Sequence, residues 1–138
     1  MGYAMERDGA VVSGVYDLKS RRFEGGGMRF LRVGEWLDDL HTGKPITRLY
    51  FEEVMGHKGT DAAHIYGGIV GIITAFCEAH EIPYSGIPVG TIKRHVTGKG
   101  NAKKERVVEA ITALGFTPQD DNEADALAIL KCVQDGVA

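Results

Sequence analysis

Cysteine is scarce in this sequence, where Cys77 and Cys132 are the only two among 138 residues. Neither has a second cysteine or a histidine nearby at zinc-finger spacing, which excludes a structural zinc site of that kind. Two isolated cysteines also exclude a disulfide framework. They predict two reduced thiols in a core or an interface.

Long apolar runs are missing as well. The most apolar window, Ile69–Cys77, is too short and too interrupted by glycine and threonine to cross a bilayer, and Met1 opens no signal-peptide pattern. No repeat or linker divides the chain, and 43% hydrophobic with 25% charged residues is an ordinary globular balance. These absences predict a single domain over residues 1–138, in a cytoplasmic protein with no membrane partner.

Positive charge is concentrated in one segment, Ile92–Val107, which holds six of the sixteen Lys and Arg and one of the nineteen Asp and Glu. This basic arm therefore carries +5, and the remaining residues carry −8. Gly98 and Gly100 permit close approach, and the helix that follows begins with free N–H groups, so the arm suits a phosphate backbone. The alternative is a solvated basic helix. The predicted DNA contacts are Lys93, Arg94, Lys99, Asn101, Lys103 and Lys104.

Acidic residues gather at two places on either side of the basic arm. Glu52 and Glu53 close an apolar run at Leu49–Phe51, and four acids crowd the start of an apolar helix in the segment Asp120–Leu130. Crowded carboxylates repel each other unless a cation lies between them, so the two groups suggest a divalent-metal site and hence a nuclease. The alternative is helix capping by Asp121 or Asn122, with acids favoured by the helix dipole.

Hydrophobic periodicity and turn residues predict nine elements. Two strands, joined by a turn at residues 7–9, precede a helix that presents Met28, Leu31, Trp36, Leu37 and Leu40 on one side. The expected ranges are strands Gly2–Glu6, Ala10–Leu18, Leu49–Val54 and Tyr84–Val89, helices Met28–Leu40 and Thr60–His80, and three helical segments from near Thr91, Asn101 and Asn122.

Three glycines, Gly67, Gly68 and Gly71, interrupt the helix predicted over Thr60–His80. Glycine weakens a helix, so we expect something to approach this helix closely. Packing against the sheet of the same chain and a contact with a second subunit are both open.

The region from about Arg48 to Val133 resembles the RuvC-type Holliday junction resolvases, particularly their phage and prophage relatives. The resemblance lies in the strand ending Phe51-Glu52, the Gly-rich helix Tyr66–Gly71, the run Lys93–Lys103 and the segment Glu123–Ala128. It implies an α/β, RNase H-like (retroviral-integrase-like) fold, with a mixed sheet flanked by helices. It also implies a homodimeric endodeoxyribonuclease that resolves four-way (Holliday) DNA junctions in recombination and repair.

In that family four acidic residues surround two Mg²⁺ ions, for which Mn²⁺ substitutes. The resemblance places the second acid on Glu52 and the last on Asp125, as catalytic and metal-binding residues. The third position falls on Asn122, also assigned a catalytic role. Asp121 or Glu123 could supply the missing charge, or Asn122 could bind metal through its carbonyl oxygen.

The front of the chain departs from the family pattern. Gly2–Ala4 matches only the end of the family's opening segment, and two strands are predicted before the first helix where the RNase H-like fold has three. We therefore expect that the first strand, with its catalytic Asp, is missing and that Met1 is an internal methionine of a longer frame or follows a shortening. The alternative function is a catalytically inactive or truncated module that binds branched DNA. A third possibility is an RNase H-like protein that acts on another nucleic acid or in nucleotide phosphoryl transfer.

Overall fold

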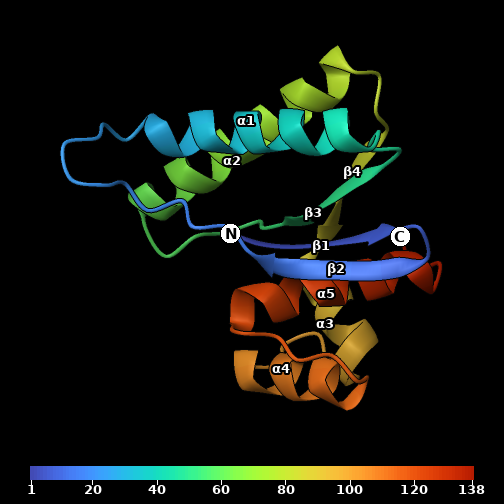
Figure 1. The fold of residues 1–138 in the computed structure, drawn as a ribbon. Helices are drawn as coiled ribbons and strands as arrows, with labels where there is room; N and C mark the ends of the chain where they lie inside the picture. The colour runs from blue at the N-terminus through green and yellow to red at the C-terminus, as the bar shows by residue number, and fades with distance from the viewer. The chain divides into compact units, whose positions relative to one another are not determined.

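The computed structural model describes all residues 1–138, and every predicted element is present (Figure 1). Ends differ by a few residues: the second strand stops at Val15 rather than Leu18, and the first helix runs on to Gly43. The observed order is β1 (Gly2–Arg7), β2 (Ala10–Val15), α1 (Met28–Gly43), β3 (Leu49–Glu53), α2 (Thr60–Ala79), β4 (Tyr84–Pro88), α3 (Val89–Thr97), α4 (Lys104–Ala113) and α5 (Asp121–Gln134).

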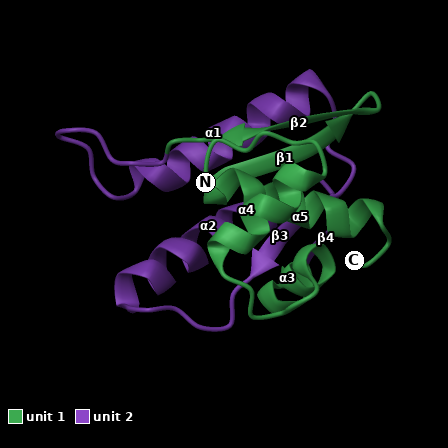
Figure 2. Ribbon diagram, turned by 90° about the horizontal axis from the view of Figure 1, so that it is seen from below, with its two compact units in different colours: residues 1–17, 87–138 green, residues 18–86 purple.

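The chain forms two compact units, residues 1–17 with 87–138 and residues 18–86 (Figure 2). We call them the hairpin unit and the two-helix unit. Their strands make two separate two-stranded sheets, β1–β2 and β3–β4. The prediction of a single domain over residues 1–138 stays a prediction.

The hairpin unit begins with β1 and β2, which pair antiparallel from Gly2 opposite Val15 to Arg7 opposite Ala10. The two-residue turn places Asp8 and Gly9 at φ +52° and +77°. Two left-handed residues are what a type I′ turn requires, and Asp-Gly is a preferred pair for it.

Helix α5 packs against both strands of the hairpin, and α3 and α4 pack against α5. The α5 residues that are buried recur at helical spacing, which gives one apolar face. The buried apolar residues of this unit are Ile87, Ile92, Ala102, Val107, Ile111, Ala124, Leu127, Ala128 and Cys132.

The two-helix unit packs α1 on α2 and pairs β3 with β4. The Leu49 amide donates to the Pro83 carbonyl (3.0 Å), and Gly86 lies against Phe51, so residue numbers rise together and the strands run parallel. Parallel neighbours need a crossover, and α2 supplies it. The core consists of Val33, Leu37, Ile73, Phe76, Cys77 and Ile82.

The predicted apolar side of α1 is wrong at one position. Leu31 is 52% exposed, whereas Val33, which the prediction omitted, is fully buried. Residues two apart lie about 200° apart around a helix, so Leu31 and Val33 cannot face the same neighbour. Because Leu37 shares the Val33 face, Leu31 is left toward solvent.

One of the three glycines of α2 has a close neighbour. A Cβ atom on Gly68 would lie 2.3 Å from a ring carbon of Phe30 on α1, whereas Cβ atoms on Gly67 and Gly71 would meet nothing within 4 Å. The approach at Gly68 therefore comes from α1, not from the sheet. Gly67 and Gly71 stay open on the exposed side of the helix.

Helix α2 is long and apolar enough, by length and composition alone, to cross a membrane. It has 20 residues, and little of it is buried. The expectation drawn from the shorter window Ile69–Cys77 was therefore wrong about length. Core helices of water-soluble proteins share this length and composition, so neither property distinguishes the two environments.

Substitution of the two neighbouring glycines separates the Phe30 contact from helix propensity. We expect Gly68→Ala to lower the free energy of unfolding by about 1–3 kcal/mol, because the methyl group would overpack against the ring. Gly67→Ala should raise it by up to about 1 kcal/mol, because alanine is the better helix former. Urea unfolding of both variants measures the difference, and equal stability would contradict the contact.

Candidate functional site

The acidic start of α5 is held by a cap and a buried carboxylate. Asp120 is the N-cap residue, and its Oδ1 accepts from the Glu123 amide (2.9 Å). The prediction of Asp121 or Asn122 as the cap was therefore wrong by one or two positions. The reason is backbone conformation: Asp120 is extended, and helical geometry begins at Asp121.

Glu123 is the one charged residue that is buried, with 7% of its surface exposed. Its Oε1 accepts a hydrogen bond from the Ser13 hydroxyl (2.7 Å), and its Oε2 accepts one from the backbone amide of Gln119 (2.8 Å). Both carboxylate oxygens thus have donors within the protein. Glu123 fastens β2 to the first turn of α5, a role that the sequence did not reveal because Ser13 lies 110 residues away.

Asp121 pairs with Lys104, the first residue of α4 (Nζ to Oδ2, 3.2 Å). The hydrogen bond and the negative charge of Asp121 raise the pKa of the Lys104 ammonium. The charges of Asp125 and Glu105 also raise it. Lys104 therefore lies within the field of Asp125 while it links the starts of α4 and α5. Of the predicted DNA contacts, this one already has an acidic partner.

Asn122 and Asp125 are three residues apart, so they share one face of α5. Asn122 is exposed and Asp125 is half-buried. A Cβ atom on Gly2 would lie 1.9 Å from the Asn122 carbonyl oxygen, so only glycine fits there. The start of β1 therefore lies directly against the turn that carries both site residues.

Glu52 lies in the two-helix unit, at the end of β3. The Tyr66 hydroxyl donates to the Glu52 carbonyl oxygen (2.8 Å) and accepts from the Val54 amide (3.1 Å), so α2 clamps this strand end. Glu52 is half-buried and Glu53 is exposed, consistent with the predicted alternation of faces. Tyr66 was not predicted as a site residue; its phenol is the group that holds the backbone of Glu52.

Neither unit by itself brings together three His, Cys, Asp or Glu side chains that could hold a metal ion. Glu52 and Asp125 belong to different units, so their pairing around a metal stays a prediction. Their chemistry fits the expectation, because carboxylate and amide oxygens are the ligands that hard divalent cations take.

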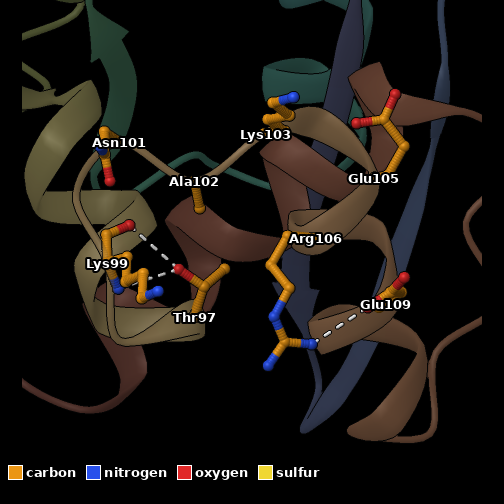
Figure 3. A pocket seen from close by; sticks show the side chains of 8 residues that line it. All are labelled: Thr97, Lys99, Asn101, Ala102, Lys103, Glu105, Arg106 and Glu109. Carbon is orange, nitrogen blue, oxygen red and sulfur yellow. Dashed lines mark hydrogen bonds and ion pairs between the residues drawn. The ribbon is translucent and has the colours of Figure 1, made fainter.

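The basic arm forms an open hollow of about 500 Å³ between the end of α3 and the first half of α4 (Figure 3). Three of the predicted DNA contacts line it: Lys99, Asn101 and Lys103. The remaining lining residues are Thr97, Ala102, Glu105, Arg106 and Glu109. Arg106 pairs with Glu109 (3.1 Å), as Figure 3 shows, so this end of the hollow is neutralised.

The loop of the hollow is held by Thr97. Its hydroxyl donates to the Lys93 carbonyl (2.7 Å) and accepts from the Lys99 amide (3.2 Å). Gly98 ends α3 in the left-handed conformation, with φ +84°. Lys103 is the N-cap of α4 and makes no side-chain cap bond, so the first amides of α4 are not covered by a cap.

Besides Lys104, two further predicted contacts lie away from the hollow's lining. Lys93 is half-buried on α3. The Arg94 guanidinium covers Gly100, since a Cβ atom there would lie 3.0 Å from Nη2. Three of the six predicted DNA contacts thus line the hollow together. The other three, Lys93, Arg94 and Lys104, lie outside its lining.

Comparison with known proteins gives the following likenesses. No family model matches the chain. The crossover junction endodeoxyribonuclease RuvC of Petrotoga mobilis is 34% identical over 112 residues, in a match that covers 75% of this chain and 66% of that protein. The match thus spans slightly less than two thirds of the relative's length.

Two solved structures share the fold. Thermus thermophilus RuvC has a TM-score of 0.69 and 22% identity over 99% of this chain and 97% of that one. T. thermophilus RuvC in complex with Holliday junction substrate has a TM-score of 0.69 and 20% identity over 85% of this chain and 74% of that one. The predicted RNase H-like fold class is confirmed.

The role of Glu123 is testable through stability. We expect Glu123→Ala to lower the free energy of unfolding by about 1–3 kcal/mol, because the Ser13 hydroxyl and the Gln119 amide lose their acceptor. Ser13→Ala should cost about 0.5–1.5 kcal/mol, and the double variant less than the sum of both. Denaturant unfolding measures all three. Asn122→Ala, at an exposed neighbour, serves as control, and strict additivity would contradict the bond.

Proposed function

We propose that this chain is a RuvC-type crossover junction endodeoxyribonuclease, which resolves four-way (Holliday) DNA junctions by metal-dependent phosphodiester hydrolysis. The observation that carries the proposal is the 34% identity to a RuvC protein over 112 residues. The RNase H-like fold over 99% of the chain agrees with it. The process served would be DNA recombination and repair, in the cytoplasm.

In the proposed site, Glu52, Asp125 and the amide oxygen of Asn122 would hold Mg²⁺, or Mn²⁺ in its place. The bound metal would activate water and stabilise the leaving oxygen. The chain's own residues set the site: Tyr66 fixes the backbone that bears Glu52, and Glu123 fixes the turn that bears Asp125.

Asn122 is the proposed third ligand because the two neighbouring acids are engaged elsewhere. Glu123 has donors on both oxygens, and Asp121 is paired with Lys104. A neutral ligand in this position would leave the metal with one negative charge fewer than an aspartate would.

The hollow of the basic arm is the proposed contact with DNA. Lys99 and Lys103 would neutralise backbone phosphates, and the amides at the start of α4 would donate to a phosphate oxygen. Asn101 would join them in the hollow. Lys93 and Arg94 would extend this surface, as would Lys104, which is paired with Asp121. Contacts of this kind read shape and charge rather than base sequence.

The proposed assembly is a homodimer formed through α2. Gly67 and Gly71 lie four residues apart, with open space above both, on a helix that is apolar but mostly uncovered. Small residues at this spacing let a second helix approach closely, and an apolar face of this kind favours a partner. A two-fold dimer matches the symmetry of a four-way junction.

Asn122 also supports a second candidate, a branched-DNA-binding module without cleavage. The position that carries an acid in the family carries an amide here, so the site could hold metal weakly. Cleavage of a labelled junction by this chain with Mg²⁺ or Mn²⁺, beside a linear duplex, distinguishes the two functions. Binding without cleavage, with cleavage appearing in Asn122→Asp, would identify the binding module.

Removal of a proposed metal ligand should abolish cleavage and spare binding. We expect Glu52→Gln and Asp125→Asn each to slow junction cleavage by about a thousandfold or more, because several kcal/mol of transition-state stabilisation is lost. Junction affinity in EDTA should change by less than about twofold. Glu53→Gln, at the exposed neighbour on the opposite face, is the matched control and should cleave normally. Normal cleavage by Glu52→Gln would show that the site is placed wrongly.

The hollow is testable through salt dependence. We expect the double variant Lys99→Ala/Lys103→Ala to bind junctions more weakly and to reduce the slope of log K against log salt by about 2, one for each phosphate that is no longer neutralised. Lys131→Ala is the control, because this lysine is held by Asp135 near the end of α5. A titration series at several salt concentrations gives the slope, and an unchanged slope would exclude the hollow as the phosphate track.

A further inference from the structure

The loop of residues 19–27, between β2 and α1, exposes a large aromatic side chain. We call it the Phe23 loop. Phe23 is 94% exposed, the highest value among the large hydrophobic residues. An exposed phenylalanine forgoes the stabilisation that burial would bring. The Phe23 ring therefore contributes nothing to the core of the folded chain.

The backbone at Phe23 is strained. Its φ is +70°, in the left-handed region that bulky residues avoid. Gly25, Gly26 and Gly27 follow within four residues, yet none of them adopts a positive φ. The chain thus places a phenylalanine in the one position of the loop that suits glycine. Strain of this kind is found at binding and catalytic sites more than elsewhere.

Glu24 fixes the loop that carries the ring. Its carboxylate accepts from the Arg21 amide (2.8 Å) and from the Arg32 guanidinium, and Arg32 also donates to the Lys19 carbonyl (3.4 Å). The Arg21 amide, followed by Arg32, lowers the pKa of Glu24. Because Arg32 belongs to α1, the loop is tied to a helix, and Phe23 is held outward in advance of any binding.

The surroundings of the ring are cationic. Arg22 places its guanidinium carbon 4.9 Å from the ring centre, and Arg21 and Lys19 precede it. Glu24, the acid of the loop, is engaged with Arg32. No apolar side chain adjoins Phe23 in sequence, as an apolar protein-binding patch would require. A single ring beside one guanidinium group, with a second arginine next in sequence, is instead suited to a base with its flanking phosphates.

We infer that the Phe23 loop binds DNA where a base is unstacked, with the Phe23 ring against the base and Arg21 and Arg22 at the adjacent phosphates. Bases inside a duplex have both faces covered by their neighbours, so an accessible face exists at a branch point or an opened pair. The inference rests on the proposed function, since it needs a branched DNA substrate. It assigns a second contact, separate from the basic arm.

The test compares variants of Phe23 in the full chain, with binding to a four-way junction and to a linear duplex measured in EDTA. We expect Phe23→Ala and Phe23→Leu to weaken junction binding by about 5- to 150-fold, the loss of one stacked base, and to leave duplex binding unchanged. Phe23→Trp should bind within about twofold of wild type. Its added emission, taken relative to the single native Trp36, should be quenched by the junction. Leu114→Ala, at a residue 50% exposed, is the control and should bind normally.

A stability measurement separates binding from structure. Phe23→Gly relieves the left-handed strain, so its melting temperature should equal or exceed that of wild type while junction binding falls. A clear loss of melting temperature would overturn the inference and assign the ring a structural role.

The remaining outcomes are distinct. Normal junction binding by Phe23→Ala and Phe23→Leu would overturn this inference alone, and equal losses for junction and duplex would overturn the assignment to an unstacked base. A wild-type chain that binds no junction would overturn the proposed function together with this inference.

Discussion

The buried carboxylate of Glu123 joins the two parts of the hairpin unit that matter most for the proposed site. One carboxylate oxygen accepts a hydrogen bond from the Ser13 hydroxyl on the second strand. The other accepts one from the backbone amide of Gln119, just ahead of the last helix. A negative charge at this end of a helix is further favoured by the helix dipole. With the backbone of Gly2 against Asn122, the hairpin and the helix start form one rigid corner. Asn122 and Asp125 take their positions from it.

The four acids crowded at the start of α5 suggested a metal ion between them, but at least three of them have partners within the protein. Asp120 accepts a hydrogen bond from a backbone amide of its own helix, and both oxygens of Glu123 accept hydrogen bonds within the protein. Asp121 forms an ion pair with Lys104. Repulsion among these three is therefore relieved without a metal. The case for a metal rests on the proposed pairing of Asp125 with Glu52, and on the likeness to a RuvC protein.

Local features of the fold were predictable from the sequence, and distant contacts were not. The Asp-Gly turn and the apolar spacing along α5 depend only on residues close together in sequence. The ends of the hairpin strands and the start of the helix were therefore predicted to within a few residues. The bond between Ser13 and Glu123 joins residues 110 positions apart, and no local pattern marks it. Likewise, the glycines of α2 signalled a close approach, but only the packing of α1 shows that Phe30 makes it, and at Gly68 alone. The site residues Glu52 and Asp125 came from the family resemblance, because spacing cannot bring two distant acids together.

The two cysteines have a consequence for following the folding of this chain. Cys77 lies in the core of the two-helix unit and Cys132 in that of the hairpin unit, both without exposed surface. Burial raises the pKa of each thiol, so neither is reactive in the folded state. Each unit thus contains one native chemical probe of its own opening. Alkylation at the two sites, resolved by mass spectrometry, would report separately on local unfolding of either unit, and matching rates would mark the pair as one cooperative structure.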